Sequence, residues 1–226
     1  MTGFPFSFLS LWIPHLKKLS VSYLPRDADP SDPPLTDGAK VEARNLYYQM
    51  RGRYPVSAIF TSLKRRALQT AEPAIEDVNN GRCGDIPIIS LNTLGQPDNG
   101  DLDPGNPDAE IDGPLKGWMI YGKRSTTDDW WKWFRTSMLY ITIAAENAPL
   151  IPEPVIWVYT HRPLVACARL AAEAEAKGEH HQLVNTTVLT SMALDKSLLP
   201  FMVLRHTRMA GGGYHLKELQ CPAICK

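Results

Sequence analysis

The stretch VIWVYTHRPLVACARLAAEAEAK, residues 155–177, predicts the fold more strongly than any other part of the sequence. Its first six residues are mostly β-branched or aromatic, which is typical of a buried strand. Pro163 suits the first turn of a helix, where its missing N–H costs no hydrogen bond. The alanine-rich run that follows favours a helix. A buried strand that leads directly into a helix is the basic unit of α/β proteins.

Strand and helix patterns alternate on both sides of this unit. In chain order, strands are expected at 4–13, 56–61, 86–91, 155–160, 184–194 and 199–204, and helices at 39–50, 63–78, 126–147 and 164–177. Thr36 is expected to cap the first helix with its hydroxyl, and the strand at 86–91 is expected to be buried. The order predicts an α/β fold, a three-layer α/β/α sandwich with a mainly parallel central sheet, as a single domain over residues 1–226.

Composition bounds the function classes. The chain has 226 residues with 24 Lys+Arg and 24 Asp+Glu, so its formal net charge is zero. A balanced charge argues against nucleic acid as the main partner, because such binding relies on clustered positive charge. The apolar content of 44% is typical of a globular protein. The 19 prolines predict long loops, above all a proline- and glycine-rich insert at about 92–124.

The cysteines and the N-terminal run indicate the compartment. The four cysteines show no zinc-binding spacing, which favours reduced thiols and a cytoplasmic location. The apolar run at 4–13 is too short to span a membrane. It also lacks a preceding basic segment, so a first strand is favoured over a signal peptide. We expect no metal, no cofactor and no membrane partner, and a homodimer remains open.

Two segments place reactive side chains at predicted strand ends, where ligands bind in α/β folds. Residues 61–71, TSLKRRALQTA, put Ser62 and Arg66 where a strand opens into a helix, which is a natural anion site. Residues 159–163, YTHRP, put His161 and Arg162 in the equivalent position of another strand. A histidine there suits acid–base or nucleophilic work. The alternative is a hydrogen-bonded structural histidine.

Aromatic residues crowd the start of the helix expected at 126–147. Trp130 is the candidate among them for the wall of a ligand pocket. The other interpretation, which we favour, is that these rings pack the helix onto the sheet.

These segments carry a resemblance to a known family. T-S-x-x-x-R-A-x-x-T-A at 61–71, D-P-P-L-T-D-G at 32–38, V-Y-T-H at 158–161, N-T-T-V through L-D at 185–195 and D-P-G-N-P-D at 103–108 follow one another in family order. Together they resemble the histidine phosphatase superfamily, which is phosphoglycerate-mutase-like, in its fungal type. The resemblance implies covalent phosphoryl transfer without a metal. Arg66 and His161 would bind the phosphoryl oxygens, a histidine in an R-H-G motif would attack phosphorus, and a carboxylate of the insert would protonate the leaving group.

The sequence departs from that pattern in the D-P-P-L-T-D-G loop, where one residue is missing before the glycine, and at two catalytic positions. The R-H-G motif is absent, and only His15 lies near its position, with no arginine before it. Gln96 stands where a fungal-type member would carry glutamate, although Asp98 and Asp101 are close by. The predicted active site is therefore degenerate.

A second Arg-His pair follows an apolar run near the C-terminus. Arg205 and His206 look like a displaced R-H-G motif, which a circular permutation would explain. The interpretation that we favour is the ordinary last strand of the family, and a third is that both side chains reach the pocket from that strand.

Three hypotheses follow. The first is an active phosphomonoesterase or mutase with an unusual nucleophile. The second, which we favour, is a repurposed enzyme for a small anionic or carbonyl-containing molecule, with His161 as general acid or base. The third is a non-catalytic anion-binding protein. The candidate catalytic residues are His161, Arg66, His15 and His206, and the candidate substrate-binding residues are Ser62, Arg162, Arg205, Gln96, Asp98 and Trp130.

Overall fold

A computed structural model of the chain describes residues 6–14, 16, 32–82, 85–95, 127–148, 153–178, 201–210 and 214–219. The side chains of residues 127–132 and of Pro163 are not described. The strands are β1 (Ser7–Pro14), β2 (Ala58–Ser62), β3 (Ile88–Leu91), β4 (Val155–Thr160), β5 (Met202–Arg208) and β6 (Tyr214–Leu219). The helices are α1 (Asp37–Arg51), α2 (Arg65–Asn79), the 3-10 turn η2 (Asn92–Leu94), α3 (Thr127–Glu146) and α4 (Arg162–Ala176).

The strands form one mixed sheet in the order β3-β2-β4-β1-β5-β6. β3, β2, β4 and β1 pair in parallel, whereas β5 pairs antiparallel with β1 and β6 pairs antiparallel with β5. The expected α/β class and mainly parallel sheet are confirmed. β6 was not expected from the sequence, and the strand expected at 184–194 lies outside the described residues.

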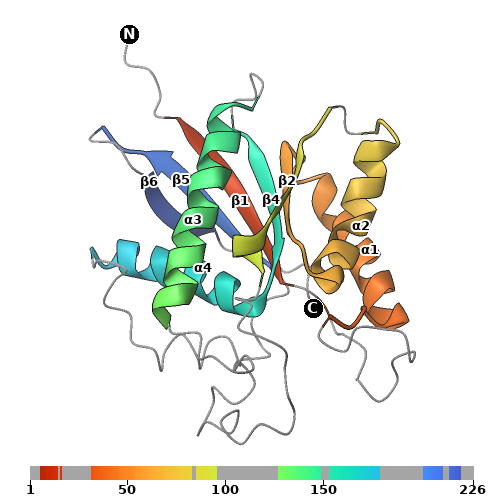
Figure 1. Cartoon of the computed structure of the whole chain (residues 1–226). Helices are drawn as coiled ribbons and strands as arrows, with labels where there is room; N and C mark the ends of the chain where they lie inside the picture. The colour runs from red at the N-terminus through yellow and green to blue at the C-terminus, as the bar shows by residue number, and fades with distance from the viewer. Residues whose placement is uncertain are drawn as a thin grey trace, which may run out of the picture.

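Both faces of the sheet are covered, as the alternation along β1 shows. Phe8 and Trp12 pack with α3 and α4 on one face. Leu9, Leu11 and Ile13 pack with α1 and α2 on the other. Figure 1 shows the two pairs of helices on opposite sides of the strands. A strand that is buried on both faces is typical of a sheet between two helix layers.

β3 corrects one expectation. It was expected to be a buried strand, but it is the edge of the sheet and its side chains are partly exposed, with Ile88 at 37%. The apolar pattern of the sequence does not distinguish an edge strand from a central one.

The described aromatic residues of α3 support the core-packing interpretation. Phe134 is buried against Trp12, with ring centroids 5.6 Å apart, and Trp133 packs against the same core. Core packing therefore accounts for these two rings. The side chain of Trp130 lies outside the described residues.

Local sequence explains how α1 begins and how it is tied to α2. The Oγ1 of Thr36 accepts a hydrogen bond from the N–H of Ala39 at 3.1 Å, which confirms the expected cap.

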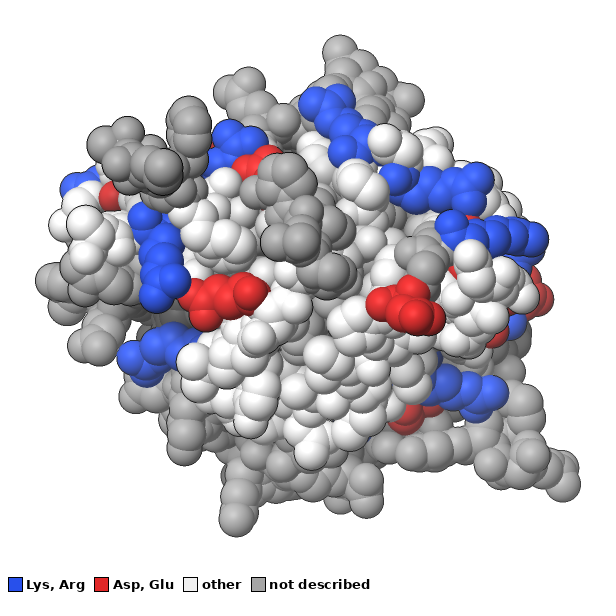
Figure 2. All heavy atoms as spheres, turned by 90° about the horizontal axis from the view of Figure 1, so that it is seen from above, with Lys and Arg blue, Asp and Glu red and all other residues white. Residues whose placement is uncertain are grey.

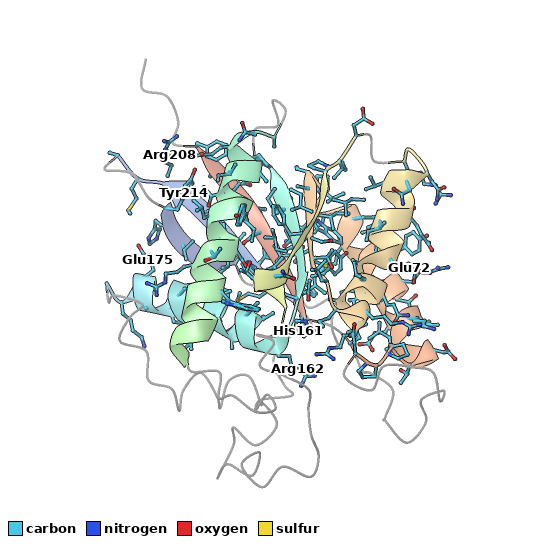
Figure 3. The ribbon with its side chains drawn as sticks, viewed as in Figure 1. Glu72, His161, Arg162, Glu175, Arg208 and Tyr214 are labelled. Atoms are coloured by element: carbon cyan, nitrogen blue, oxygen red, sulfur yellow. The ribbon has the colours of Figure 1, made fainter. Side chains whose placement is uncertain are left out.

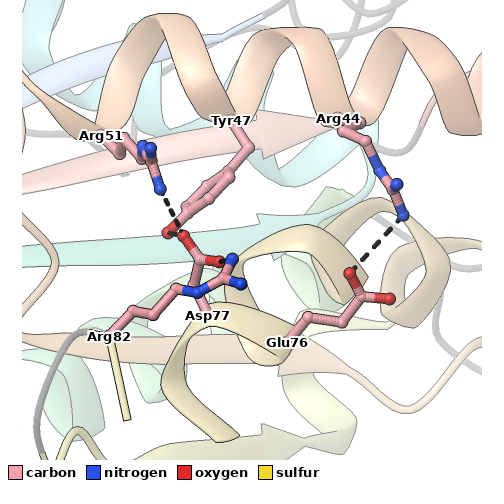
Figure 4. Close-up of polar contacts among 6 residues, drawn as sticks. All are labelled: Arg44, Tyr47, Arg51, Glu76, Asp77 and Arg82. Atoms are coloured by element: carbon pink, nitrogen blue, oxygen red, sulfur yellow. Dashed lines mark hydrogen bonds and ion pairs between the residues drawn. The ribbon is translucent and has the colours of Figure 1, made fainter. Parts of the chain in front are cut away.

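Near the end of α2, the buried carboxylate of Asp77 accepts hydrogen bonds from Tyr47 (2.8 Å), Arg51 (2.6 Å) and Arg82 (2.9 Å). Figure 4 shows these three donors converging on that carboxylate. This cluster fastens α2 against α1.

The charges of the surface are mixed in sign. Figure 2 shows basic and acidic side chains around a broad area of uncharged described residues. In the described part of the chain, no helix is both long and apolar enough for a membrane span.

Candidate functional site

The candidate site lies where β2 and β4 end and the next helices begin. Ser62 is the last residue of β2, Arg66 is the second residue of α2, and His161 links β4 to α4. β2 and β4 are neighbouring parallel strands, so their carboxyl ends meet at the same edge of the sheet. Figure 3 shows His161 and Arg162 at one end of the sheet, with Arg208 and Tyr214 at the other.

His161 contacts both other residues. Its imidazole is only 2% exposed. Nε2 lies 3.2 Å from the Oγ of Ser62, and Nδ1 lies 3.4 Å from a terminal nitrogen of Arg66. A guanidinium can only donate hydrogen bonds, so Nδ1 must accept in this contact. Nε2 then carries the proton and donates to Ser62, and the imidazole is neutral in this arrangement.

Arg66 brings a positive charge into the interior. Its side chain is 4% exposed. Burial lowers the pKa of this guanidinium below its usual value, and the nearby carboxylate of Asp32 opposes that shift. Arginine stays protonated in proteins, so the site holds a buried cation beside a neutral histidine. Such a charge attracts anions more strongly than an exposed one would.

Ser62 is a third polar group of the site. Its Oγ accepts a hydrogen bond from the N–H of Lys64 at 3.2 Å and faces His161. Because Nε2–H of His161 donates to it, the hydroxyl keeps its own proton for donation. Ser62 is fully buried, so this donor is held in place by packing.

The turn η2 closes one side of the site. Thr160 Oγ1 donates to the carbonyl of Leu94 at 2.6 Å. At Gly95, a Cβ atom would lie 2.9 Å from the carbonyl oxygen of Asn92 and 3.4 Å from Ser62 Oγ. A side chain at this position would therefore be too close to the carbonyl oxygen of Asn92 and would also contact Ser62. The predicted site residues did not include Gly95, and only tertiary contact distinguishes it from the other glycines of the loop.

Asp32 is a further residue that the predicted site did not include. Its Oδ2 accepts a hydrogen bond from the N–H of Arg65 at 2.7 Å, which caps α2. Lys64, the residue before α2, provides no side-chain cap. The D-P-P-L-T motif drew attention to this loop, but the sequence does not show that it contacts a helix that starts more than thirty residues later.

The remaining predicted residues divide into two groups. Arg162 adjoins His161 and is exposed. Arg205 and His206 lie beside the beginning of β1, away from the strand ends that carry the site, because β5 runs antiparallel to β1. Arg205 pairs with Glu153, which precedes β4, at 2.9 Å.

His206 is a core residue of that opposite region. Its Nε2 lies 2.6 Å from the Oγ of Ser10, and its ring stacks on Phe8 with centroids 4.2 Å apart. The structure therefore does not bring Arg205 or His206 to His161. His15, Gln96 and Asp98 lie outside the described residues. Among the residues described, no three His, Cys, Asp or Glu side chains are grouped as metal ligands would be.

Comparisons with known proteins agree with the fold. The histidine phosphatase superfamily (branch 1) matches residues 26–137. YhfR of Bacillus stearothermophilus has 20% identity and a TM-score of 0.56, over 92% of this chain and 95% of its own. A mycobacterial glucosyl-3-phosphoglycerate phosphatase has 14% identity and a TM-score of 0.58, over 96% of this chain and 100% of its own. A mycobacterial hydrolase has 16% identity and a TM-score of 0.58, over 96% and 97%. No curated protein matches the chain.

Proposed function

Because the chain has the histidine phosphatase fold and the resemblance to that superfamily is confirmed, we propose that it binds a small anionic molecule at Ser62, Arg66 and His161. In this proposal, His161 acts as a general acid or base. The observation that carries it is the buried Arg66 guanidinium within 3.4 Å of the buried His161 imidazole. Charge buried at the carboxyl edge of a parallel sheet is typical of a ligand site.

The contacts suggest how binding and acid–base chemistry would be linked. An anion that enters beside Arg66 would accept hydrogen bonds from its N–H groups. These bonds would replace the contact of Arg66 with Nδ1 of His161. Nδ1 becomes available as a base, while Nε2–H remains oriented by Ser62. A general base must reach the proton that it abstracts, and this exchange would expose Nδ1 only when an anion is present.

The end of β1 supports a change from standard phosphohistidine chemistry. β1 ends at Pro14, which pairs with Thr160 of β4. The resemblance implies an arginine in an R-H-G motif at this strand end, yet proline has neither a positive charge nor an N–H. A transferring phosphoryl group needs several positive or donor groups around it, so this substitution favours a different reaction.

The same register supports a second candidate, phosphoryl transfer from a phosphomonoester to His15 and then to water. Pro14 and Thr160 are paired, and each is followed in the sequence by a histidine, His15 and His161. His15 itself lies outside the described residues. The mycobacterial glucosyl-3-phosphoglycerate phosphatase bears the name of that activity, but its 14% identity shows the fold alone.

Two measurements distinguish the candidates. The first is phosphate and vanadate binding by calorimetry for the wild type, Arg66→Ala and the exposed neighbour Arg65→Ala. We expect Arg66→Ala to weaken binding at least tenfold and Arg65→Ala to leave it within about twofold, since exposed charges are screened. Equal binding by all three proteins would refute the proposed anion site.

The second measurement is para-nitrophenyl phosphate turnover by the wild type, His15→Ala and His161→Ala. The favoured proposal expects no turnover above the level of His161→Ala. Robust turnover that His15→Ala abolishes, together with an acid-labile phosphoenzyme in the wild type alone, would establish the second candidate and exclude the first.

A further inference from the structure

Asp32 lies beside the candidate site and is only partly used by the hydrogen bonds of the fold. Its Oδ2 accepts the N–H of Arg65 at 2.7 Å. Its Oδ1 is buried and accepts no hydrogen bond within the described part of the chain. The loop that carries it is held to α2 a second time, because Gln69 accepts the N–H of Leu35 at 2.7 Å. Asp32 is therefore a fixed carboxylate and not a mobile surface charge.

The charge of Asp32 acts on the buried cation of the site. Arg66 follows Arg65 directly, and Asp32 is the carboxylate whose attraction opposes the effect of burial on Arg66. His161 is neutral in its contact with Arg66, and Pro14, which ends the neighbouring strand β1, carries no charge. Within the described residues of the site, the negative charge of Asp32 therefore balances the positive charge of Arg66.

We propose that Asp32 is an internal counter-ion that makes this site select monoanions, such as carboxylates and phosphodiesters, over the dianions of phosphate monoesters. The inference rests on the proposed function and names its substrate class. A single negative charge can be matched by Arg66 and by the donors of Ser62 and His161. A second negative charge would meet the carboxylate of Asp32 in a poorly solvated region, where like charges repel strongly.

The exposed cations near the site do not change this balance. Arg65 and Arg162 are exposed, and Lys64 is half-buried. Water and salt screen such charges over about 10 Å. They would speed the approach of any anion, but they would not make the site prefer monoanions or dianions.

The test compares two probes of similar shape at pH 8. Dimethyl phosphate is a monoanion, whereas methyl phosphate is mostly a dianion because the second pKa of a phosphate monoester is about 6. Calorimetry gives both dissociation constants for the wild type and for Asp32→Asn, which keeps an oxygen to accept the N–H of Arg65 but removes the charge. Asp37→Asn is the matched control, since Asp37 is exposed and pairs with Lys40 at 3.0 Å.

We expect the wild type to bind dimethyl phosphate at least as tightly as methyl phosphate. Asp32→Asn should raise the affinity for methyl phosphate about fivefold more than that for dimethyl phosphate, and Asp37→Asn should leave the ratio unchanged. If Asp32 had a purely structural role, Asp32→Asn would weaken the binding of both probes. The expected gain in affinity for methyl phosphate is the opposite result.

Two contrary results have different meanings. If both probes bind in a manner that depends on Arg66 but Asp32→Asn does not shift their ratio, the counter-ion role is wrong and the proposed function survives. If neither probe binds the wild type, the proposed function and this inference both fail.

Discussion

At the scale of single residues, the candidate site combines two side chains that are both capable of carrying positive charge. Arg66 and His161 are buried within 3.4 Å of each other. Two cations at that distance in a poorly solvated region would repel. The arrangement avoids this because the imidazole accepts from the guanidinium and is neutral. An incoming anion would offset the repulsion, so that both side chains could carry a positive charge. For this reason the pair suits a binding site better than a structural one.

Replacing Arg66 by methionine should separate binding from stability. Methionine fills much of the same volume without a buried charge, so we expect the free energy of unfolding to change by less than about 1 kcal/mol or to increase. Phosphate affinity should fall at least tenfold because the buried cation is lost. Urea unfolding and calorimetry measure the two quantities, with Arg65→Met as the control. A large loss of stability with unchanged affinity would mean that Arg66 is structural.

At the scale of elements, α2 is fixed at both of its ends by carboxylates. Asp32 caps its first residue from the loop before α1. Asp77 near its last turn receives Tyr47 and Arg51 from α1. Burial by itself would raise the pKa of Asp77, but hydrogen bonds from Tyr47, Arg82 and Arg51 outweigh it and hold the pKa below the usual 3.8. These contacts hold α2 at both ends and so fix the position of Arg66 on it.

Replacing Asp77 by asparagine should loosen this attachment. The two arginines and the tyrosine lose their charged partner, and we expect a loss of about 2–4 kcal/mol in the free energy of unfolding at pH 7. Because the pKa of Asp77 is lowered by folding, its contribution is present above about pH 4 and disappears as the pH falls further. The variant should therefore differ least from the wild type in acid.

The control for Asp77 is Glu76→Gln. Glu76 pairs with Arg44 at 3.5 Å, and both side chains are about half exposed. Such a pair contributes at most about 1 kcal/mol. Equal effects of the two substitutions in urea unfolding would contradict the role assigned to Asp77.

The turn η2 is the other element that shapes the site. Alanine at Gly95 would place its Cβ 2.9 Å from the carbonyl of Asn92 and 3.4 Å from Ser62 Oγ. We expect Gly95→Ala to cost about 1–3 kcal/mol and to shift the NMR signal of the His161 ring, which contacts Ser62. Gly52→Ala is the control because its Cβ would meet nothing within 4 Å. An undisturbed His161 signal in Gly95→Ala would show that η2 does not bear on the site.

At the scale of the whole molecule, the sheet joins a parallel part to an antiparallel part, and β1 belongs to both. β1 pairs in parallel with β4 and antiparallel with β5. At this junction, His206 of β5 meets Ser10 of β1 at 2.6 Å. Trp12 also donates to the same Ser10 oxygen at 2.8 Å. Burial lowers the pKa of His206 to about 3, so this histidine is neutral in the folded protein at ordinary pH.

His206 should make the protein sensitive to acid. A histidine whose pKa is lowered by folding contributes fully above about pH 6.5, and the contribution declines as the pH falls toward 3. Between pH 6.5 and 4.5 we expect this residue to account for about 2–3 kcal/mol of lost stability. Urea unfolding of His206→Phe at several pH values should show a shallower decline than that of the wild type.

His215→Asn serves as the control for His206. His215 is exposed and contacts Glu175 at 3.1 Å. Its removal should leave the steep decline of the wild type. If His206→Phe declined as steeply as the wild type, burial of His206 would not be a source of acid sensitivity.

Much of the fold could be predicted from the sequence because secondary structure depends on local patterns. The strand at 155–160 agrees with β4 to the residue, and the Thr36 cap and Pro163 mark where helices begin. Alternating strands and helices then leave few arrangements other than a sheet between two helix layers. The exposed position of β3 and the presence of β6 could not be predicted in this way, since the order of strands depends on distant pairings.

For the site, the sequence by itself determined which residues lie where a strand leads into a helix, namely Ser62, Arg66 and His161. Only the tertiary structure decided that they meet, because 95 residues separate Arg66 from His161 and the pairing of β2 with β4 brings them together. It likewise decided that Arg205 and His206 do not join them. Because β5 is antiparallel to β1, these residues lie beside the beginning of β1 and not beside its end. Strand direction is set by how the whole chain packs, and no local pattern encodes it.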